Sequence, residues 1–173
     1  MKRKLVALFA VVAVFAWVPL SPLFNSTAHA ESTAKTDVLK QTMELAKQGK
    51  AVNSGSFGLQ SKKSSILKKW GKPEYQDQFT LNYDKHQVSF YLDNQGIVKS
   101  LETTDAKLVP VSHDQVAKTL GKPFESDAGA GQYYESYHAG KNDVTFHWTS
   151  MKKPNGELSL TSVKIEKAPK HKK

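Results

Sequence analysis

The sequence predicts an α+β fold in which two tandem repeats, each a short helix and an antiparallel meander, form one sheet with the short helices on one face. Two observations predict it. The stretch "ILKKWGKP" at residues 66–73 returns as "VAKTLGKP" at residues 116–123. Both are followed by short segments in which apolar and polar residues alternate, as in a half-buried strand. Two copies are too few for a solenoid, so we expect the meanders to join in one layer.

Each copy of the repeated stretch predicts a short amphipathic helix. Its apolar residues fall at i, i+1 and i+4, which places them on one helix face. Ser61 is the expected N-cap of the first helix, and Ser112 with Gln115 forms a capping box for the second. Trp70 and Leu120 end the two apolar faces at matching positions. This match favours core packing for Trp70 over a sugar-stacking role.

The same two stretches predict where these helices end. Gly71 and Gly121 stand where a left-handed residue closes a helix. Pro73 and Pro123 follow and prevent the helix from continuing. A phosphate-binding loop would place its glycines before a helix, so neither stretch is one.

The segments after the two stops predict three strands each. In the last strand, Leu158 and Leu160 are out of phase with Val163 and Ile165, which predicts a β-bulge. Glu135 stands where the alternation calls for an apolar residue. The expected strands are centred on residues 79–83, 88–92, 97–102, 133–137, 144–148 and 158–166, with turns at 84–85, 93–96 and 153–156.

The domain organisation follows from these elements and from composition. We expect a signal peptide over 1–30, then a leader, a first helix and the first repeat over 31–108. The second repeat covers 109–166, and 167–173 is a basic tail expected to be disordered. The first helix is expected from Asp37 to Gln48, and residues 31–35 before it are expected to be a short disordered leader.

The first thirty residues have the pattern of a secretory signal. Three basic residues precede an apolar run at 5–18, and "AHA" ends at Ala30. This pattern predicts cleavage between Ala30 and Glu31 and a secreted protein. The alternative is an uncleaved anchor, but a span needs about 20 apolar residues and this run is shorter. We therefore expect no integral membrane segment after cleavage.

Net charge and the absence of cysteine indicate where the protein works and what it is attracted to. The chain has no cysteine and a net charge of +9. Without cysteine there is no disulfide, thiolate metal site or cysteine nucleophile, and export from a Gram-positive type of cell is favoured. A basic exported protein is attracted to anionic wall polymers. The tail "KAPKHKK" either keeps the protein soluble or contacts the wall, and the sequence leaves both open.

The chain resembles the YjgB-like family of secreted Bacillus-type domains of unknown function. The resemblance is carried by "AKQGKAV" (46–52), "GSFGLQSKKSSILKKWGKP" (55–73) and "VSHDQVAKTLGKP" (111–123). It also extends to the architecture of the tandem-repeat beta-lactamase inhibitor protein. What the resemblance implies is a two-repeat α+β fold with no established activity and no catalytic residues to carry over. Unlike the inhibitor protein, this chain lacks cysteines, and its second copy lacks a leading helix.

No catalytic motif is present, so the sequence predicts no cofactor and no catalytic or metal-ligating residue. It contains no G-x-S-x-G elbow, H-E-x-x-H helix or P-loop. His138 and His147 flank one predicted hairpin and could approach each other as a ligand pair, but surface histidines are the simpler interpretation.

The alternation also predicts a polar sheet face opposite Phe90 and Phe146. The candidate partner-binding residues on it are Tyr91, Tyr134, His138 and His147. Aromatic and hydroxyl side chains are common at binding surfaces, although antiparallel sheets also have faces that are merely solvated. Other residues of the same parity are Thr80, Asn82, Gln87, Ser89, Ser136 and Thr145.

The function favoured is a secreted, non-enzymatic binding module that uses this open face. Its expected partner is a secreted protein or an anionic cell-wall component, and nucleic acid is not expected. The alternatives are an extracellular hydrolase that uses His138 or His147 with a carboxylate, and a basic protein associated with the wall by charge alone. We expect a monomer.

Overall fold

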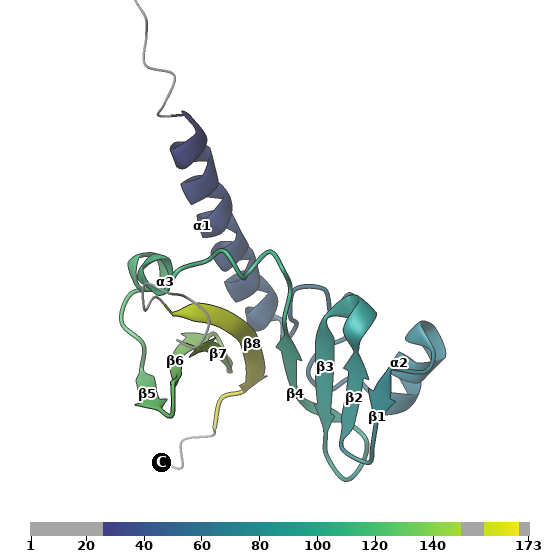
Figure 1. Cartoon of the computed structure of the whole chain (residues 1–173). Coiled ribbons are helices and arrows are strands. Elements are labelled where there is room, and N and C mark those ends of the chain that lie inside the picture. Colours follow the sequence, from purple (N-terminus) through teal and green to yellow (C-terminus); the bar gives the residue numbers. More distant parts are fainter. Residues whose placement is uncertain (1–25, 150–157, 170–173) are drawn as a thin grey trace, which may run out of the picture.

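The computed structural model, which describes residues 26–149 and 158–169, is an α+β fold of three α-helices and one open eight-stranded antiparallel sheet (Figure 1). The predicted turn at 153–156 and most of the predicted signal and tail lie outside these residues. The elements are α1 Ser26–Lys47, α2 Lys63–Trp70, β1 Tyr75–Gln76, β2 Thr80–Tyr83, β3 Val88–Leu92, β4 Val98–Thr103, α3 His113–Leu120, β5 Glu125–Gly129, β6 Gln132–Ala139, β7 Asn142–Thr149 and β8 Ser159–Lys167.

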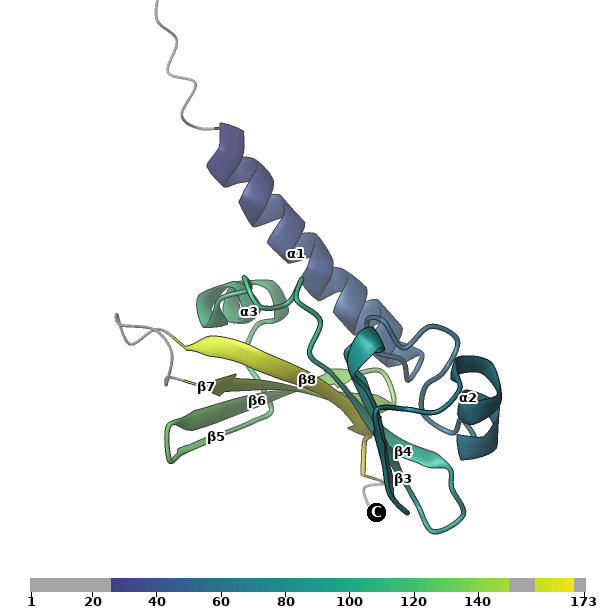
Figure 2. The ribbon, with the colours of Figure 1, turned by 45° about the vertical axis from the view of Figure 1, so that its right-hand side comes forward.

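The strand order is β1-β2-β3-β4-β8-β7-β6-β5. Strands β1–β4 form one meander and β5–β8 another, and the last strands of the two pair with each other. The expectation that two meanders join in one antiparallel layer is thus confirmed. Figure 2 shows that the two halves of the sheet are turned relative to each other about the β4–β8 junction.

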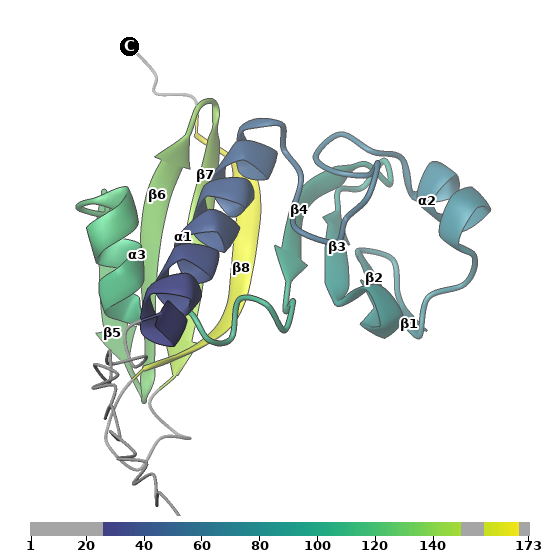
Figure 3. The same ribbon diagram turned by 90° about the horizontal axis from the view of Figure 1, so that it is seen from above.

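The helices cover one face of the sheet. In Figure 3, α1 and α3 lie over the β5–β8 half, and α2 lies beside the β1–β4 half. Register places Phe90, Leu101, Ile165 and Val144 side by side across four strands, and each of the four is completely buried. This row joins the cores of the two halves. Trp148 is 1% exposed, and Trp70 and Leu120 pack against the same core, so their predicted core positions are confirmed.

The first helix is longer than predicted. Helix α1 begins at Ser26 and includes residues 31–35, so the expected disordered leader is wrong. The stretch is rich in Ala, Lys, Glu, Ser and Thr and contains neither Gly nor Pro, so nothing in it interrupts a helix. The end is as expected, because Gly49 follows with a φ of 74°. The predicted cleavage between Ala30 and Glu31 falls within this helix.

The predicted caps differ between the two short helices. The capping box of α3 is confirmed: the Gln115 backbone N–H donates to Ser112 Oγ at 3.3 Å, and the Ser112 N–H donates to Gln115 Oε1 at 3.1 Å. The predicted Ser61 cap is wrong, since Lys62 holds the N-cap position of α2 without a side-chain bond. Ser61 Oγ accepts instead from the Gly58 N–H at 3.0 Å, within the preceding loop.

Both helix stops need glycine, but not for the predicted reason. Gly71 has φ 79° and ψ −160°, and Gly121 has φ 80° and ψ −148°. These values lie in a region that is essentially restricted to glycine, whereas the left-handed helical region was predicted. Each N–H donates to the carbonyl four residues earlier and so ends the helix. Pro73 and Pro123 follow as expected.

The structure confirms the bulge that the sequence predicted in the last strand, but it also contains two edge strands that were not predicted. Thr161 has no partner between the pairs His147–Ser162 and Trp148–Leu160, which confirms the predicted bulge in β8. The edge strands β1 and β5 were not predicted. Strand β1 has two residues, and every residue of β5 is exposed, so neither strand leaves an alternating pattern in the sequence.

Candidate functional site

The predicted candidate residues all lie on the sheet face opposite the buried row. Tyr91 pairs with Ser100, Ser100 with Glu166, and Asp143 with both Glu166 and His138, so these residues form one row across the sheet. Tyr134 pairs with His147 in a second row. We call this surface the open face. Of the residues predicted for it, Gln87 lies instead in the turn before β3.

Glu102, which the sequence analysis did not single out, connects Tyr91 to His147. The Tyr91 hydroxyl donates to Glu102 Oε2 at 2.8 Å. Burial, followed by the Glu102 carboxylate, raises the pKa of Tyr91 to about 12. Burial lowers the pKa of His147, and the negative charge of Glu102 partly opposes this effect. An imidazole at this position therefore favours its neutral form more than an exposed histidine does, because burial lowers the pKa of His147.

A hollow on the open face lies between Glu102 and the hairpin that joins β5 to β6. Its volume is about 600 Å³. The Tyr134 and His147 rings that line it have centroids 6.2 Å apart, and the Tyr134 hydroxyl lies 3.4 Å from Glu125 Oε1. We call this hollow the face cavity. Its lining is formed by Glu102, Asp127, Ala128, Gly129, Gln132, Tyr133, Tyr134, His147, Trp148, Thr149 and Thr161.

His138 lies at the other end of the open face. Its Nδ1 is 2.8 Å from Asp143 Oδ1, and the Asp143 side chain is 8% exposed. The ring of Phe124 stacks on His138 at 4.0 Å with an interplanar angle of 3°. This arrangement fixes the imidazole in one orientation and leaves its Nε2 without a partner among the described residues.

His138 and His147 do not form a ligand pair. Register places His138 opposite Asp143, four residues from His147 on β7, which corresponds to about 13 Å along the strand. In the part of the chain that the structure describes, no group of three or more His, Asp or Glu side chains is arranged to hold a metal ion. The hypothesis that these two histidines converge is therefore wrong.

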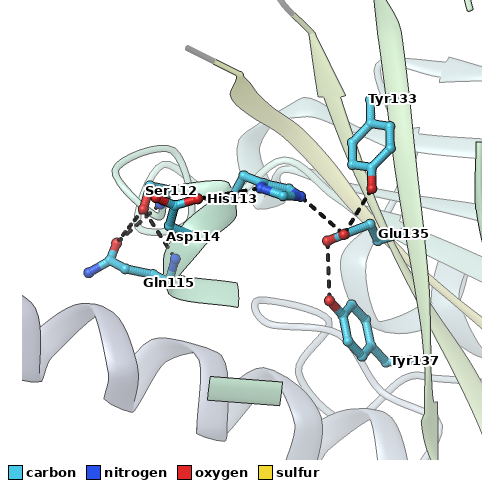
Figure 4. A network of polar contacts seen from close by, with 7 residues as sticks. All are labelled: Ser112, His113, Asp114, Gln115, Tyr133, Glu135 and Tyr137. Carbon is cyan, nitrogen blue, oxygen red and sulfur yellow. Dashed lines mark hydrogen bonds and ion pairs between the residues drawn. The ribbon is translucent and has the colours of Figure 1, made fainter. Parts of the chain in front are cut away.

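A second polar cluster lies on the helix-covered face, around Glu135 (Figure 4). This residue is 3% exposed. Its Oε1 accepts from the Tyr133 hydroxyl at 2.9 Å and contacts His113 Nε2 at 3.0 Å, and its Oε2 accepts from the Tyr137 hydroxyl at 3.1 Å. The cluster explains why an acidic residue interrupts the apolar pattern of β6. The signal in the sequence was a glutamate with a tyrosine two residues to either side.

This cluster connects α3 to the sheet. His113 is the first residue of α3, and its ring also packs at an angle against Tyr133 and Trp148. Burial and the Glu135 carboxylate raise the pKa of the Tyr137 hydroxyl, so it remains a donor at neutral pH. Because partners already surround the carboxylate, the arrangement is suited to holding the helix in place rather than to contacting a ligand.

The fold and these surfaces define a small α+β protein in which one sheet face is covered by helices and the other is open. The chain belongs to the DUF4309 family, a domain of unknown function, whose family model matches residues 39–164. A structural comparison agrees with this family assignment. A crystal structure of a DUF4309 family protein (YjgB) from Bacillus subtilis aligns with a TM-score of 0.65 and 13% identity over 79% of this chain and 99% of that chain.

At this level of identity the likeness concerns the fold alone. The comparison with curated proteins finds no match. Among the described residues, no helix has the length and apolar character needed to cross a membrane.

Proposed function

We propose that this chain is a secreted, non-enzymatic binding module that engages its partner through the open face. The observation that carries the proposal is the face itself: Tyr91, Tyr134 and His147 lie on it beside a cavity of about 600 Å³. Aromatic side chains dominate the binding energy of protein interfaces. Cavities with a few convergent polar groups are the usual place for recognition.

The proposed location outside the cell rests on the sequence. The signal pattern at residues 1–30 supports secretion, and the absence of cysteine supports export from a Gram-positive type of cell. The partner is either a secreted protein or an anionic wall component, and the module is expected to act as a monomer. The matching stretches at 66–73 and 116–123, each followed by a meander, support an origin of the fold by tandem repetition.

The experiment compares two variants in a pull-down from secreted and wall fractions. The open-face variant carries Tyr91→Ala and Tyr134→Ala, and the control carries Phe79→Ala, an exposed aromatic outside the strands. We expect the open-face variant to lose a saturable partner that wild type and control both retain. If the partner is retained by a folded open-face variant, the binding site lies elsewhere.

A hydrolase is the second candidate, and the His138–Asp143 pair favours it. A buried carboxylate that orients a histidine through Nδ1 and leaves Nε2 free is the arrangement used for general-base catalysis. Turnover of an ester, phosphate or glycoside substrate that disappears with Asp143→Asn would favour this function over the binding module. The charge-driven alternative makes a different prediction, namely binding to any polyanion that is lost with added salt.

A further inference from the structure

The positive charge of the described chain is concentrated in one segment. Residues 45–73, which run from the end of α1 through α2, contain seven lysines and neither Asp nor Glu. At residues 26–44, 74–149 and 158–169, ten lysines stand against fifteen Asp and Glu residues. The basic character of the described chain therefore belongs to residues 45–73. Their lysines are Lys47, Lys50, Lys62, Lys63, Lys68, Lys69 and Lys72.

The charge of these lysines is largely uncompensated. Within the described residues, one of the seven, Lys47, forms an ion pair, with a glutamate one turn earlier in α1. Lys63 Nζ donates instead to the backbone carbonyl of Asp77 at 2.9 Å, and Lys69 Nζ donates to Ser56 Oγ at 3.1 Å. These neutral acceptors orient the two ammonium groups and leave their positive charge in place.

Helix α2 directs this charge away from the sheet. It packs inward through Ile66, which is completely buried, and Trp70, whose ring centroid lies 5.7 Å from that of Phe90 on the covered face. The exposed residues of the stretch 62–70 are all lysine or serine, as expected for the opposite side of a helix with 3.6 residues per turn. We call the following set, with the flanking lysines included, the basic surface: Lys62, Lys63, Ser64, Ser65, Lys68, Lys69 and Lys72.

The basic surface also has a recess at one end. Lys62, Lys63 and Ser64 line a hollow of about 480 Å³ together with the turn that joins β3 to β4. An ammonium group donates up to three hydrogen bonds and accepts none, and a hydroxyl can also donate. The surface and its recess are therefore suited to an anion that presents several oxygen atoms.

The kind of basic residue narrows the chemistry of this anion. Lysine binds phosphate as a point charge, whereas arginine recognises a carboxylate or phosphate through a planar fork. The sequence contains one arginine, Arg3, so the basic surface has none. Its charges extend over about 10 Å of helix between Lys62 and Lys69, because each residue rises by about 1.5 Å. Separate point charges in a row suit a linear polymer with one charge in each repeat.

Two other anionic partners fit this surface less well. An interfacial helix inserts apolar side chains into a membrane, but the apolar side chains of α2 pack toward the sheet. Single-stranded nucleic acid is bound by stacking its bases on aromatic rings, and the exposed residues of the stretch 62–70 include no aromatic residue.

We infer that the basic surface binds a linear phosphodiester polymer. It lies on the helix-covered side of the sheet, so attachment there leaves the open face available to another partner. The inference does not depend on the proposed function, because the two surfaces share no residue.

The experiment titrates soluble poly(glycerol phosphate) into the full chain by calorimetry at several salt concentrations. The basic-surface variant carries Lys62→Gln, Lys68→Gln and Lys69→Gln. We expect it to bind at least about tenfold more weakly than wild type, because each lysine near an anionic surface adds to the attraction. Its affinity should also depend less steeply on salt, since fewer counterions are released.

A matched variant removes the same charge elsewhere. It carries three substitutions at exposed positions in the second half of the chain, namely Lys118→Gln, Lys122→Gln and Lys141→Gln. We expect its affinity to stay within about twofold of wild type, because exposed charges that lie far from the polymer are screened. Thermal unfolding should show that both lysine variants are folded.

Further arms of the experiment separate the possible sources of the anion. An oligothymidylate with the same number of phosphates should bind no more tightly than the polymer. Vesicles of phosphatidylglycerol should be released at or below the salt concentration that releases the polymer. Tighter binding of the oligothymidylate would assign the surface to nucleic acid, and vesicle binding that outlasts polymer binding would assign it to a membrane. Either result overturns the inference.

Equal weakening in the two lysine variants would also overturn it, because the net charge of the chain would then act without a defined surface. The variant with Tyr91→Ala and Tyr134→Ala should bind the polymer as wild type does. If it loses the polymer, the open face is the polymer site and the basic surface is not. If it loses only its captured partner, the two surfaces act separately, as we expect.

Discussion

Each face of the sheet carries a glutamate bound by tyrosine, but the two carboxylates differ in burial and in the number of their hydrogen bonds. On the covered face, Glu135 is 3% exposed and contacts two tyrosine hydroxyls and a histidine. On the open face, Glu102 is partly exposed and accepts one side-chain hydrogen bond, from Tyr91. A buried carboxylate is stable only when its hydrogen bonds are made inside the protein, whereas an exposed one keeps capacity for a partner.

Residue type alone therefore does not separate a structural site from a binding site. Tyrosine, histidine and glutamate occur in both clusters. What separates them is the covering by α1 and α3, which lies on one face only (Figure 3). Substitutions on the covered face should therefore lower stability, and substitutions on the open face should lower binding.

The largest expected effect comes from neighbouring residues of β3 that lie on opposite faces. Phe90 is completely buried, so Phe90→Ala should lower the free energy of unfolding by about 3–5 kcal/mol. Tyr91→Ala should lower it by about 1 kcal/mol or less, because its ring is only partly buried. Urea denaturation of the two variants measures both values. Similar losses for the two would contradict the division between the faces.

The next largest difference in stability is expected between substitutions of the two carboxylates, Glu135 and Glu102. Glu135→Gln keeps the shape but puts an amide donor among the donors of Tyr133, Tyr137 and His113, so we expect a loss of about 1–3 kcal/mol of stability. Glu102→Gln should change stability by less than about 0.5 kcal/mol. Thermal unfolding of both variants tests this ranking, and a more damaging Glu102→Gln would reverse the assignment of the two sites.

A comparable effect is expected at the end of α2, which lies beside the β1–β4 half. Gly71→Ala should cost about 1–3 kcal/mol because of its backbone angles, since a Cβ at this position would contact nothing within 4 Å. Gly129 is a matched control with the same open space and an ordinary φ, and Gly129→Ala should be nearly neutral. Equal melting temperatures for the two variants would show that the backbone angles of Gly71 do not matter.

The smallest effect is the pH dependence contributed by His147. Its pKa is lowered by burial, so the unfolded chain binds a proton more readily than the folded one. This group should not affect stability above the ordinary pKa of about 6.5. Stability should fall as the pH falls from there toward the lowered pKa, and should level off below it. Denaturation curves at pH 8, 6 and 5 should show a shallower decline for His147→Gln than for wild type. An identical decline would remove His147 as its source.

The sequence predicted which residues share a face because strand alternation is a local property. Tyr91, Tyr134, His138 and His147 were placed on the open face by alternation alone, and register confirms the placement. The bulge in β8 was predicted in the same way, from Leu158 and Leu160 being out of phase with the residues that follow.

Long-range partners could not be predicted in this way. Tyr91 and Glu102 meet only after β3 pairs with β4, and His113 meets Glu135 only after α3 packs on β6. Strand β5 was missed because all of its side chains are exposed and it has no apolar alternation. The extension of α1 to Ser26 was missed because residues 26–30 were interpreted as the end of a signal peptide and residues 31–35 as a disordered leader, although the stretch contains no helix breaker.

The most direct test of the open face is side-chain footprinting of the chain with and without its captured partner, because it reports which exposed side chains the partner covers. We expect the partner to protect Tyr91, Tyr134 and His147 from hydroxyl-radical oxidation and to leave the exposed Phe79 and Val109 unchanged. Protection of Phe79 and Val109 with full reactivity at Tyr91 and Tyr134 would contradict it.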